Sequence, residues 1–491
     1  MNEELELSEI LQTRRDKLTK FREDGRDPFL STTFERTSRA RIIKDTFEES
    51  ENTDVSIAGR MMSKRDMGKA FFCDLLDDTG RIQLYIRVDD IGAEAFAEFK
   101  KFDIGDIIGV SGFVFRTRKG EISVHCKSVE LLAKSLLPLP EKFHGLKDND
   151  LRYRQRYVDL IVNPDVRRKF EIRAAVIRGV RSYFDSNGYL EVETPVLQTV
   201  SGGAAARRFT TEHNALNLTM YLRIELELNL KRLIVGGLDR VYEIGRLFRN
   251  EGMDATHNPE FTTVEFYEAF TDMYGIMERV EGIFRSAMRC AGIEGSTLNY
   301  QGLELDFSSP FRRISMVEAV REYTGVDFDS FSGAEDAAQA AGAIGVELPK
   351  ELTWGSILFE CFDRKVEDKL IQPTFVTRHP VEVSPLAKRC ADDPRLTERF
   401  ELFVARREIA NAFSELNDPI DQRERFQKQA DARSAGNEEA AMMDEDFITA
   451  LEYGMPPTGG CGIGIDRLVM LLTDSATIRE VILFPTMKPI E

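Results

Sequence analysis

Residues 240–267 read RVYEIGRLFRNEGMDATHNPEFTTVEFY, two segments of alternating apolar residues on either side of a polar loop. Side chains two residues apart lie on the same face of a strand, so Phe261, Thr263, Glu265 and Tyr267 are predicted to share one surface. A guanidinium such as that of Arg249 can fork onto phosphate oxygens, an aromatic ring can stack on a purine, and a carboxylate beside a phenol can hold an ammonium group. The stretch therefore predicts a nucleoside triphosphate site, although any one of these residues alone fits a salt-bridged hairpin equally well.

The motifs FRNEG and HNPEFT within this stretch resemble the second signature motif of class II aminoacyl-tRNA synthetases, and of their lysyl branch in particular. The resemblance covers nearly the whole chain, through SGGAAAR (201–207), SPLAKR (384–389), FSELNDP (413–419) and GIGIDR (462–467). It implies an α+β protein with an N-terminal OB-fold β-barrel and a class II catalytic domain, whose antiparallel β-sheet is flanked by helices. It also implies an enzyme that activates L-lysine with ATP and transfers it to tRNA(Lys).

The chain has 491 residues, which is too long for one ordinary core, and a net charge of -18 from 66 basic and 84 acidic residues. Binding to a polyanion such as tRNA must therefore be local. One basic cluster, TRRDKLTKFR at 13–22, lies in an imperfect helical stripe that Arg14 interrupts, and a merely solvated helix is an equally good interpretation. The apolar residues of the stripe are Leu7, Ile10, Leu11, Leu18 and Phe21.

The six cysteines are scattered without CxxC pairs, which indicates neither a disulfide framework nor a thiolate zinc site. No run of apolar residues approaches the length that spans a membrane. We therefore expect a reduced, cytoplasmic setting and no membrane partner.

The pattern along the chain predicts a helical extension over 1–54, a barrel domain over 55–137, a proline-marked linker over 138–150 and a catalytic domain over 151–491. Five short alternating segments with Gly-containing turns at 79–80 and 119–120 are typical of a small barrel. Within the catalytic domain we place motif 1 at about 170–197, motif 2 at about 240–268 and motif 3 at about 459–473. Residues of about 274–380 are interpreted as an insertion that interrupts the sheet.

The resemblance makes the barrel the anticodon-binding domain. It implies that Phe72 stacks on a base, while Gln83 and Glu121 hydrogen-bond the middle anticodon base. Stacking tolerates any base, so the polar pair must supply the discrimination. From the residues alone, Phe72 is more naturally a barrel core residue.

Motif 1 combines an amphipathic helix, predicted over 170–187 and closed by Asn187-Gly188, with the strand YLEVETPV over 189–196. Pro195 restricts this strand to the edge of a sheet. In the family this motif builds the dimer interface, so the resemblance implies a homodimer.

Activation of lysine joins a carboxylate, already ionised at neutral pH, to the α-phosphorus of ATP. Catalysis then reduces to alignment and charge neutralisation, which needs arginines and a metal ion rather than a general base. By resemblance, Arg249 and Arg467 are the catalytic residues. The implied ATP-binding residues are Arg249, Glu251, His257, Asn258, Phe261, Glu401, Glu408 and Arg467, and the implied lysine-binding residues are Gly203, Glu227, Arg249, Glu265, Tyr267, Asn411 and Glu415.

The segment FELFVARREIANAF, residues 400–413, is predicted to be a hairpin that turns at Ala405-Arg406. Phe403 then opposes Glu408, and Glu401 is the diagonal neighbour of Glu408 on the same face, so that the two carboxylates could share Mg²⁺. Alternatively, Glu401 and Glu408 are an ordinary solvent-facing pair without a metal ion. Asn411 falls on the opposite parity, as does Glu415, so a bulge or bend must intervene.

Glu415 and Tyr267 match the family's partners for the substrate ε-ammonium, and Gly203, Glu227 and Glu265 match positions near its amino group. The chain departs from the lysyl pattern at four places: Arg208 replaces a common proline, Glu225-Leu226 an Ala-Pro pair, Asn229 a tyrosine, and Ala405-Arg406 a Gly-containing turn. Glu225 adds a carboxylate beside Glu227 and is expected to raise a neighbouring pKa.

The sequence also admits three other interpretations. The glycines of GGCGIGIDR, residues 459–467, fail the dinucleotide pattern GxGxxG because position 465 is isoleucine. A diverged paralogue could activate another amino acid or lysylate a protein, but the barrel argues against the protein-lysylating branch, and Glu415 with Tyr267 disfavours aspartyl and asparaginyl relatives. A non-catalytic RNA-binding scaffold is disfavoured because Arg249, Arg467 and both metal-position glutamates are present.

Overall fold

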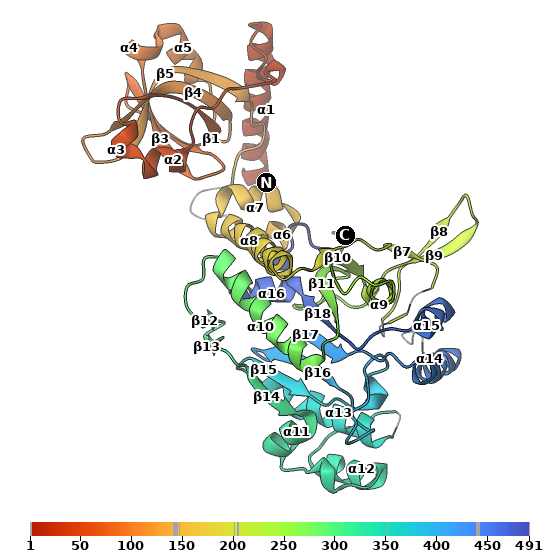
Figure 1. Ribbon diagram of the computed structural model, residues 1–491. Coiled ribbons are helices and arrows are strands. Elements are labelled where there is room, and N and C mark those ends of the chain that lie inside the picture. The colour runs from red at the N-terminus through yellow and green to blue at the C-terminus, as the bar shows by residue number, and fades with distance from the viewer. Residues whose placement is uncertain are drawn as a thin grey trace. The chain divides into compact units, whose positions relative to one another are not determined.

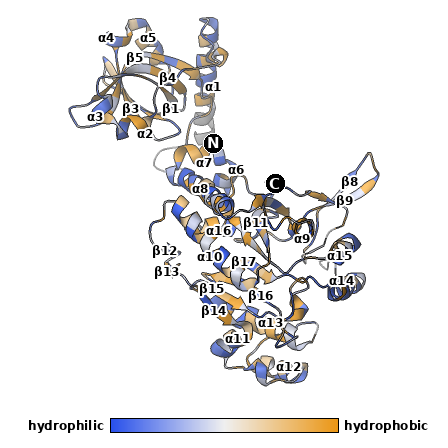
Figure 2. Cartoon of the chain, in the orientation of Figure 1, coloured by the Kyte–Doolittle hydropathy of each residue, from blue (hydrophilic) through white to orange (hydrophobic). Residues whose placement is uncertain are grey.

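A computed structural model describes the chain apart from residues 1, 141–145, 147, 201, 204–205, 351, 438–441 and 491. The chain forms two compact units, Met1–Lys147 and Asp148–Glu491 (Figure 1). Residues 141–145 and 147 of the predicted linker, and Ser201, Ala204 and Ala205 of the SGGAAAR motif, lie outside the described residues. Hydrophobic and hydrophilic residues alternate along the helices in Figure 2, and no described helix is long and apolar enough to cross a membrane.

The first unit contains the predicted five-stranded barrel, which closes in the order β1-β2-β3-β5-β4. Alternation dictates this fold: Ile82, Leu84 and Ile86 of one strand point inward and are buried, whereas the residues between them are half-exposed. Two short helices that the sequence analysis did not identify, α4 (Val88–Ile91) and α5 (Ala93–Phe99), connect β3 to β4. The strands are β1 (Asp54–Asp66), β2 (Ala70–Leu76), β3 (Arg81–Arg87), β4 (Ile107–Arg116) and β5 (Ile122–Ala133).

The helical extension consists of α1 (Asn2–Glu23), α2 (Ala40–Asp45) and α3 (Phe47–Ser50). Arg14, which interrupts the apolar stripe of α1, is buried and donates hydrogen bonds to the carbonyls of Ile104, Ser135 and Leu137. Leu18 and Phe21 are buried on the same helix. The interpretation of α1 as a merely solvated helix is therefore wrong, because this face packs on its own unit and Arg14 is a hydrogen-bonded part of the packing.

The second unit is built on an eight-stranded sheet with the order β14-β15-β16-β17-β18-β11-β10-β6. The predicted antiparallel sheet is confirmed for the strands from β15 to β10, and it is mixed because β14 pairs parallel with β15 and β6 pairs parallel with β10 at its two edges. The strands are β6 (Leu190–Glu191), β10 (Arg240–Phe248), β11 (Glu260–Ala269), β14 (Arg312–Ser315), β15 (Thr374–Thr377), β16 (Arg399–Val404), β17 (Arg407–Ser414) and β18 (Thr458–Gly464).

Helices cover both faces of the sheet (Figure 1). On one face α8 (Pro164–Ser186), α10 (Met273–Cys290) and α16 (Ile465–Leu472) share a core with Val264 and Phe266 of β11. On the other, α9 (Glu227–Val235), α14 (Pro419–Ser434) and α15 (Glu445–Glu452) pack around Tyr267 of β11 and Phe413 of β17. Alternate side chains of β11 therefore point to opposite faces of the sheet. Val264 and Phe266 enter the core with α8, α10 and α16, and Tyr267 faces α9, α14 and α15.

The remaining elements lie at the periphery of this unit. The helices α6 (Asn149–Arg154) and α7 (Arg156–Val162) precede α8. A small sheet has the order β7-β9-β8, and β12 pairs with β13. These strands are β7 (Leu197–Gln198), β8 (Thr210–His213), β9 (Leu218–Leu222), β12 (Thr297–Tyr300) and β13 (Leu303–Asp306).

Motif 1 differs from its prediction at both ends. Its helix α8 begins six residues earlier than predicted, with Pro164 in its first turn, and ends as predicted at an Asn187 cap followed by Gly188 with φ +74°. The strand β6 is only two residues long, at the edge of the sheet, and Pro195 lies beyond it. The predicted strand over 189–196 is therefore wrong in length.

The stretch of 274–380, interpreted as an insertion, does not interrupt the sheet. Helix α10 belongs to the core, and β14 and β15 extend the sheet at one edge. The segment between those two strands packs Val317, Leu358 and Phe362 into a separate core that also contains Val376 of β15 and Phe403 of β16. Its helices are α11 (Met316–Thr324), α12 (Ala334–Ala343) and α13 (Trp354–Lys365).

The β16–β17 hairpin turns at Ala405-Arg406 as predicted, and both residues have positive φ, 50° and 67°. This is the turn geometry in which glycine is unstrained, which gives a physical reason for glycine at this turn in the lysyl pattern. We expect Ala405→Gly to stabilise the second unit by about 1 kcal/mol, because it removes left-handed strain from a methyl-bearing residue. Urea unfolding measures the effect, and an unchanged or lower midpoint would contradict the strain argument.

Candidate active site

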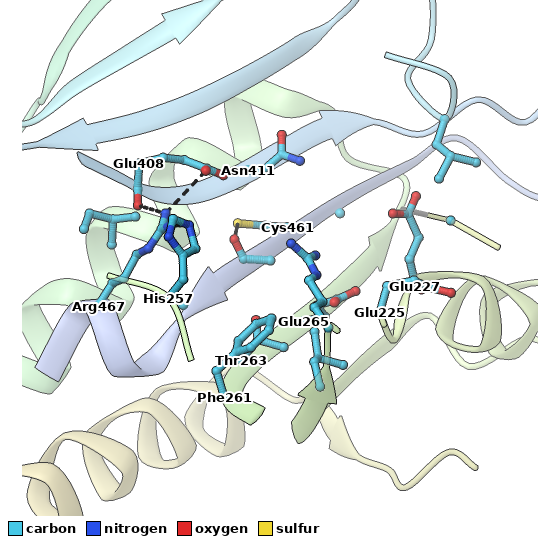
Figure 3. A pocket seen from close by; sticks show the side chains of 18 of the residues that line it. Glu225, Glu227, His257, Phe261, Thr263, Glu265, Glu408, Asn411, Cys461 and Arg467 are labelled. Carbon is cyan, nitrogen blue, oxygen red and sulfur yellow. Dashed lines mark hydrogen bonds and ion pairs between the residues drawn. The ribbon is translucent and has the colours of Figure 1, made fainter. Parts of the chain in front are cut away.

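A cavity of about 680 Å³ opens on the face of the sheet that carries Phe261, Thr263, Glu265 and Tyr267 of β11. The predicted shared surface is therefore confirmed. Figure 3 shows His257, Glu408 and Arg467 gathered at one end, Glu225 and Glu227 at the other, and Phe261, Thr263 and Glu265 between them. Of the predicted residues, the cavity is lined by Gly203, Glu227, Arg249, Glu251, His257, Asn258, Phe261, Glu265, Tyr267, Glu408, Asn411 and Arg467.

Glu401 and Glu415 do not line the cavity and lie just behind it. Glu401 pairs in register with Asn411, which is in the wall, and Glu415 lies against Gly460, which is also in the wall. Both carboxylates are buried. The oxygens of these two carboxylates can therefore contact a ligand only where the cavity wall is open.

The glycines of β18 make room over the polar face of β11. Gly462 pairs with Glu265 and Gly460 with Tyr267, and a Cβ on Gly460 would overlap Glu415 Oε1 and the Tyr267 ring. The run GGCGIG is therefore a strand that needs small residues, not a phosphate-binding loop, which agrees with the failed dinucleotide pattern.

At one end of the cavity, Arg467 donates to the carbonyl of Glu408 at 2.7 Å and to His257 Nε2 at 3.3 Å. Arginine is a donor only, so Nε2 must accept and the His257 proton lies on Nδ1, 2.8 Å from Asp254 Oδ2. Burial alone would raise the pKa of Asp254, but hydrogen bonds from His257 and Thr256 hold it well below its usual range. The result is an oriented end of the cavity in which the Arg467 guanidinium lies beside His257 and the partly exposed carboxylate of Glu408.

Arg249 follows β10, and its guanidinium lies 5.3 Å from the centre of the Phe261 ring. Its Nε is buried and has no hydrogen-bond partner in the described part of the chain. A buried donor without a partner is costly unless a ligand completes it. The Phe261 ring and this donor therefore mark a binding surface in the middle of the cavity.

A buried ionic link joins the three motifs beneath the cavity. Asp466 of α16 accepts from Arg173 of α8 at 2.5 Å and from the Thr262 amide of β11 at 2.6 Å. Arg173 also donates to Thr262 Oγ1 at 3.2 Å. Because Asp466 precedes Arg467, the link fixes the helix that presents the arginine.

The predicted bulge in the β16–β17 hairpin is confirmed. Phe403 pairs with Glu408 but Glu401 pairs with Asn411, with the register shift between Leu402 and Phe403. The extra residue on β17 changes parity, which is why Asn411 can line the cavity together with Glu408.

Arg399, which the sequence analysis missed, joins the two strands and the SPLAKR loop. It donates to Asn411 Oδ1 at 3.0 Å, to Glu401 Oε1 at 2.6 Å and to Ser384 Oγ at 3.0 Å. Its position two residues before Glu401 on a strand was an available signal. The solvent-facing alternative is wrong for Glu401, which is buried and ion-paired, and fits only Glu408, which is partly exposed.

Glu367 is a further carboxyl near this hairpin that the sequence analysis missed. Burial, followed by the carboxylates of Asp363, Glu401 and Glu408, raises its pKa to about 7. Among the described residues no three His, Cys, Asp or Glu side chains are arranged to hold a metal ion by themselves. A metal at Glu401 and Glu408 would need ligands from a bound phosphate, which is the usual manner of Mg²⁺.

The other end of the cavity is acidic. Glu265 accepts from the Tyr267 hydroxyl at 3.2 Å and from the Leu226 amide at 3.3 Å, while Glu225 accepts from the Leu228 amide at 3.2 Å. Burial and the neighbouring carboxylate of Glu227 raise the pKa of Glu265 to about 7. Burial, together with Glu265 and Glu227, raises the pKa of Glu225 well above its usual value. The sequence analysis expects the added carboxylate of Glu225 to raise a neighbouring pKa. In the structure the pKa of Glu225 itself is raised.

Gly203 and Leu226 show how the chain accommodates Glu225. Gly203 has φ +87°, and a Cβ there would lie 2.7 Å from Glu225 Cδ. The Leu226 amide that donates to Glu265 does not exist in a proline. Glu225-Leu226 takes the place of the Ala-Pro pair of the lysyl pattern. This change therefore adds the Glu225 carboxyl and, at the same time, a backbone amide that donates to Glu265.

Glu415 is fully buried and forms an ion pair with Lys231 of α9, whose Nζ also contacts Glu227 Oε1 at 2.5 Å. The sequence analysis missed Lys231. Its spacing of four residues from Glu227 on a helix was the signal for this ion pair.

In the barrel, Phe72 is half-buried outside the core, next to Tyr85 with 4.9 Å between ring centres. Its interpretation as a core residue is wrong, because its neighbours Phe71 and Cys73 take the inward positions. Gln83 accepts from Ser123 Oγ at 3.1 Å on an adjacent strand, and Ser123 Oγ also lies 3.3 Å from the carbonyl of Glu121. Phe72 and Gln83 thus lie on the same face of the neighbouring strands β2 and β3, whereas the carboxylate of Glu121 pairs with Lys44 at 3.7 Å.

Comparisons with known proteins cover both units. A family model for class II tRNA synthetases (D, K and N) matches residues 148–488, and a model for the OB-fold nucleic acid binding domain matches residues 55–132. The chain is 56% identical over 490 residues to a lysine–tRNA ligase of Pelotomaculum thermopropionicum, covering 99% of this chain and 96% of the relative. It is 56% identical over 485 residues to that of Thermoanaerobacter pseudethanolicus (99% and 97%) and 55% identical over 484 residues to that of Moorella thermoacetica (99% and 99%).

Proposed function

The chain belongs to the lysine–tRNA ligase branch of the class II tRNA synthetases, and from this premise we propose how its residues bind ATP and lysine and join lysine to tRNA(Lys). The observation that carries the proposal is the polarity of one cavity, with Arg467 and His257 at one end, a cluster of glutamates at the other and Arg249 between them. The end with Arg467 suits the triphosphate of ATP, which is a polyanion. The end with the glutamates suits lysine, which carries two ammonium groups.

In the proposed complex, Phe261 stacks on the adenine and Arg467 covers its other face and reaches the γ-phosphate. Glu251, His257 and Asn258 position the adenine and the bent triphosphate. The unpartnered Nε of Arg249 and its central position support a role in holding the α-phosphate and the lysine carboxylate together. Proximity and charge neutralisation at the α-phosphorus then drive adenylate formation with release of pyrophosphate.

The lysine end uses Glu415 and Tyr267 for the ε-ammonium, and Gly203, Glu227 and Glu265 for the region of the α-amino group, with Asn411 in the wall between them. The depth of Glu415 behind Gly460 supports an ε-ammonium site at the far end of the cavity. A neutral side chain there would leave a buried carboxylate without a counter-ion, which is strongly unfavourable.

Mg²⁺ is proposed at Glu401 and Glu408, which fit it as hard oxygen donors beside the predicted phosphates. When bound, the ion would neutralise phosphate charge. We expect Glu408→Gln to raise the Mg²⁺ concentration needed for half-maximal activity by about tenfold or more, because a direct ligand is lost. Mn²⁺ binding in the presence of ATP, followed by electron paramagnetic resonance, checks the affinity directly. Glu424→Gln, on the exposed side of α14, is the matched control, and equal Mn²⁺ binding by both variants would refute the site.

The barrel is proposed to hold the anticodon, with Phe72 stacking on a base and Gln83 and Glu121 reading the middle one. The aromatic pair of Phe72 and Tyr85 on its surface supports this role. A role in protein synthesis implies a cytoplasmic location.

A homodimer is proposed through motif 1. The support is the open edge at β6, together with exposed Leu190, Leu197, Leu216 and Leu218 on or next to β6 to β9. Light scattering should give a mass twice that of the chain, and a monomer would contradict the assignment.

The test of the function is charging of unfractionated tRNA with labelled amino acids, Mg²⁺ and ATP. The proposal predicts incorporation of lysine alone. Incorporation of another amino acid would support the paralogue alternative, and none at all would support a scaffold role.

A further inference from the structure

Lys231 is the only cation that contacts the buried glutamates at the acidic end of the cavity, as far as the described residues go. Its side chain has no exposed surface, and its Nζ lies 5.2 Å from the centre of the Phe413 ring and 6.0 Å from that of Tyr267. Burial alone would lower the pKa of Lys231, but Glu227 and Glu415 raise it above its ordinary value. An ammonium group is therefore already present at the end of the cavity where the substrate ε-ammonium is proposed to bind.

The two oxygens of Glu415 face different groups. Oε2 contacts Lys231 Nζ, whereas Oε1 lies on the side of Gly460 and Tyr267, both of which line the cavity. Neither oxygen has a hydrogen-bond partner within the described part of the chain. Oε2 is thus held by the ion pair with Lys231, and Oε1 is the oxygen on the side of the cavity.

We propose that Lys231 is a specificity-determining positioning residue, an internal ammonium that holds Oε2 of Glu415, favours the ionised carboxylate and turns Oε1 toward the ε-ammonium of the substrate. The inference deepens the proposed function and rests on it. Lys231 does not line the cavity, so it acts through Glu415 and not by touching the substrate.

The charge around Glu415 shows why such a cation is needed. Burial raises the pKa of Glu415 well above its usual value and the carboxylates of Glu227 and Glu265 add to this, while Lys231 acts in the opposite direction. Loss of Lys231 would raise the pKa further and favour the neutral carboxyl, which discriminates less in favour of an ammonium group. The titratable or charged groups that face this cluster are Lys231 and Glu227 of α9, Glu265 and Tyr267 of β11, Arg249 after β10, Cys461 of β18, and Glu225 before α9.

The opposite effect is also physically possible. Lys231 could compete with the substrate for Glu415, in which case its removal would strengthen lysine binding. The ion pair with Oε2 rather than Oε1 argues against competition, because Oε1 is the oxygen that lies on the side of the cavity.

The test is lysine-dependent exchange of pyrophosphate into ATP by the full-length wild type and Lys231→Met. We expect the KM for lysine to rise about 100-fold with a much smaller change in the KM for ATP, because the loss falls on the ionised form of Glu415. The KM of the variant should fall as the pH rises from about 6.5 to 8.5, since a higher pH restores the ionised carboxylate, and the wild type should change less.

A second variant keeps the test independent of how well methionine fits. In Lys231→Ala, added n-propylammonium replaces the missing atoms and should restore lysine binding, whereas propan-1-ol should not. The matched control is Lys134→Met, which removes another fully buried lysine with two carboxylate partners, Asp103 and Asp106, in the barrel. It should lower stability without changing the KM for lysine.

An unchanged or lower KM in Lys231→Met, equal losses toward ATP and lysine, or rescue by propan-1-ol would each overturn the inference. A wild type without lysine-dependent exchange would overturn the proposed function itself, which separates the two failures.

Discussion

Replacing Arg249 with glutamine should lower kcat/KM for lysine-dependent pyrophosphate exchange by about 10³-fold or more, in the range seen when a preorganised charged donor is removed from a phosphoryl-transfer site. Arg249 lies between the two ends of the cavity, with a buried Nε that has no partner in the described residues. It is therefore placed to bind developing negative charge at the point where lysine and ATP meet. Loss of one donor there removes both alignment and neutralisation.

The matched control is Arg246→Gln on β10, the strand that Arg249 follows. Arg246 is exposed, forms a long ion pair with Glu260 at 3.5 Å and does not line the cavity. We expect its rate to stay within about twofold of the wild type, as is typical of a surface charge. Equal losses in the two variants would show that Arg249 acts through the stability of the hairpin and not through the reaction.

Replacing Glu415 with glutamine should abolish lysine-dependent ATP turnover while the fold is retained. The amide cannot carry the charge that an ε-ammonium needs in a buried site, and truncation of such a pair costs about 2–5 kcal/mol or more in binding. It also leaves Lys231 with Glu227 as its remaining carboxylate partner. A moderate loss of stability should therefore accompany the loss of activity.

The assay is lysine-dependent ATP turnover together with thermal unfolding. Glu281→Gln is the control, because Glu281 is also buried and ion-paired, with Arg285, but lies outside the cavity. It should lose stability and keep its KM for lysine. Near-normal turnover by folded Glu415→Gln would refute the ε-ammonium role.

The parts of the site that follow from strand parity could be predicted from the sequence. The alternation in 261–267 placed four side chains on one face, and the conflicting parity of Glu408 and Asn411 required a bulge, which exists. Local chemistry decides both features, because the pleat has a fixed period of two and one extra residue changes it.

Other features depend on tertiary context that local patterns do not encode. The partner of Lys231 is Glu415, 184 positions away on another element, and the partners of Arg14 are three backbone carbonyls of distant segments. The membership of β14 and β15 in the sheet is equally non-local, since each strand is only four residues long. The parallel pairs at the sheet edges follow from that connectivity and not from any residue pattern.

The central claim is most directly tested by pyrophosphate exchange into ATP with purified protein and Mg²⁺, run separately with lysine, aspartate, asparagine, ornithine and no amino acid. Strong exchange with lysine alone is the predicted result, because the cavity presents carboxylates at the depth of an ε-ammonium. Exchange with aspartate or asparagine, or none with any amino acid, would contradict the account.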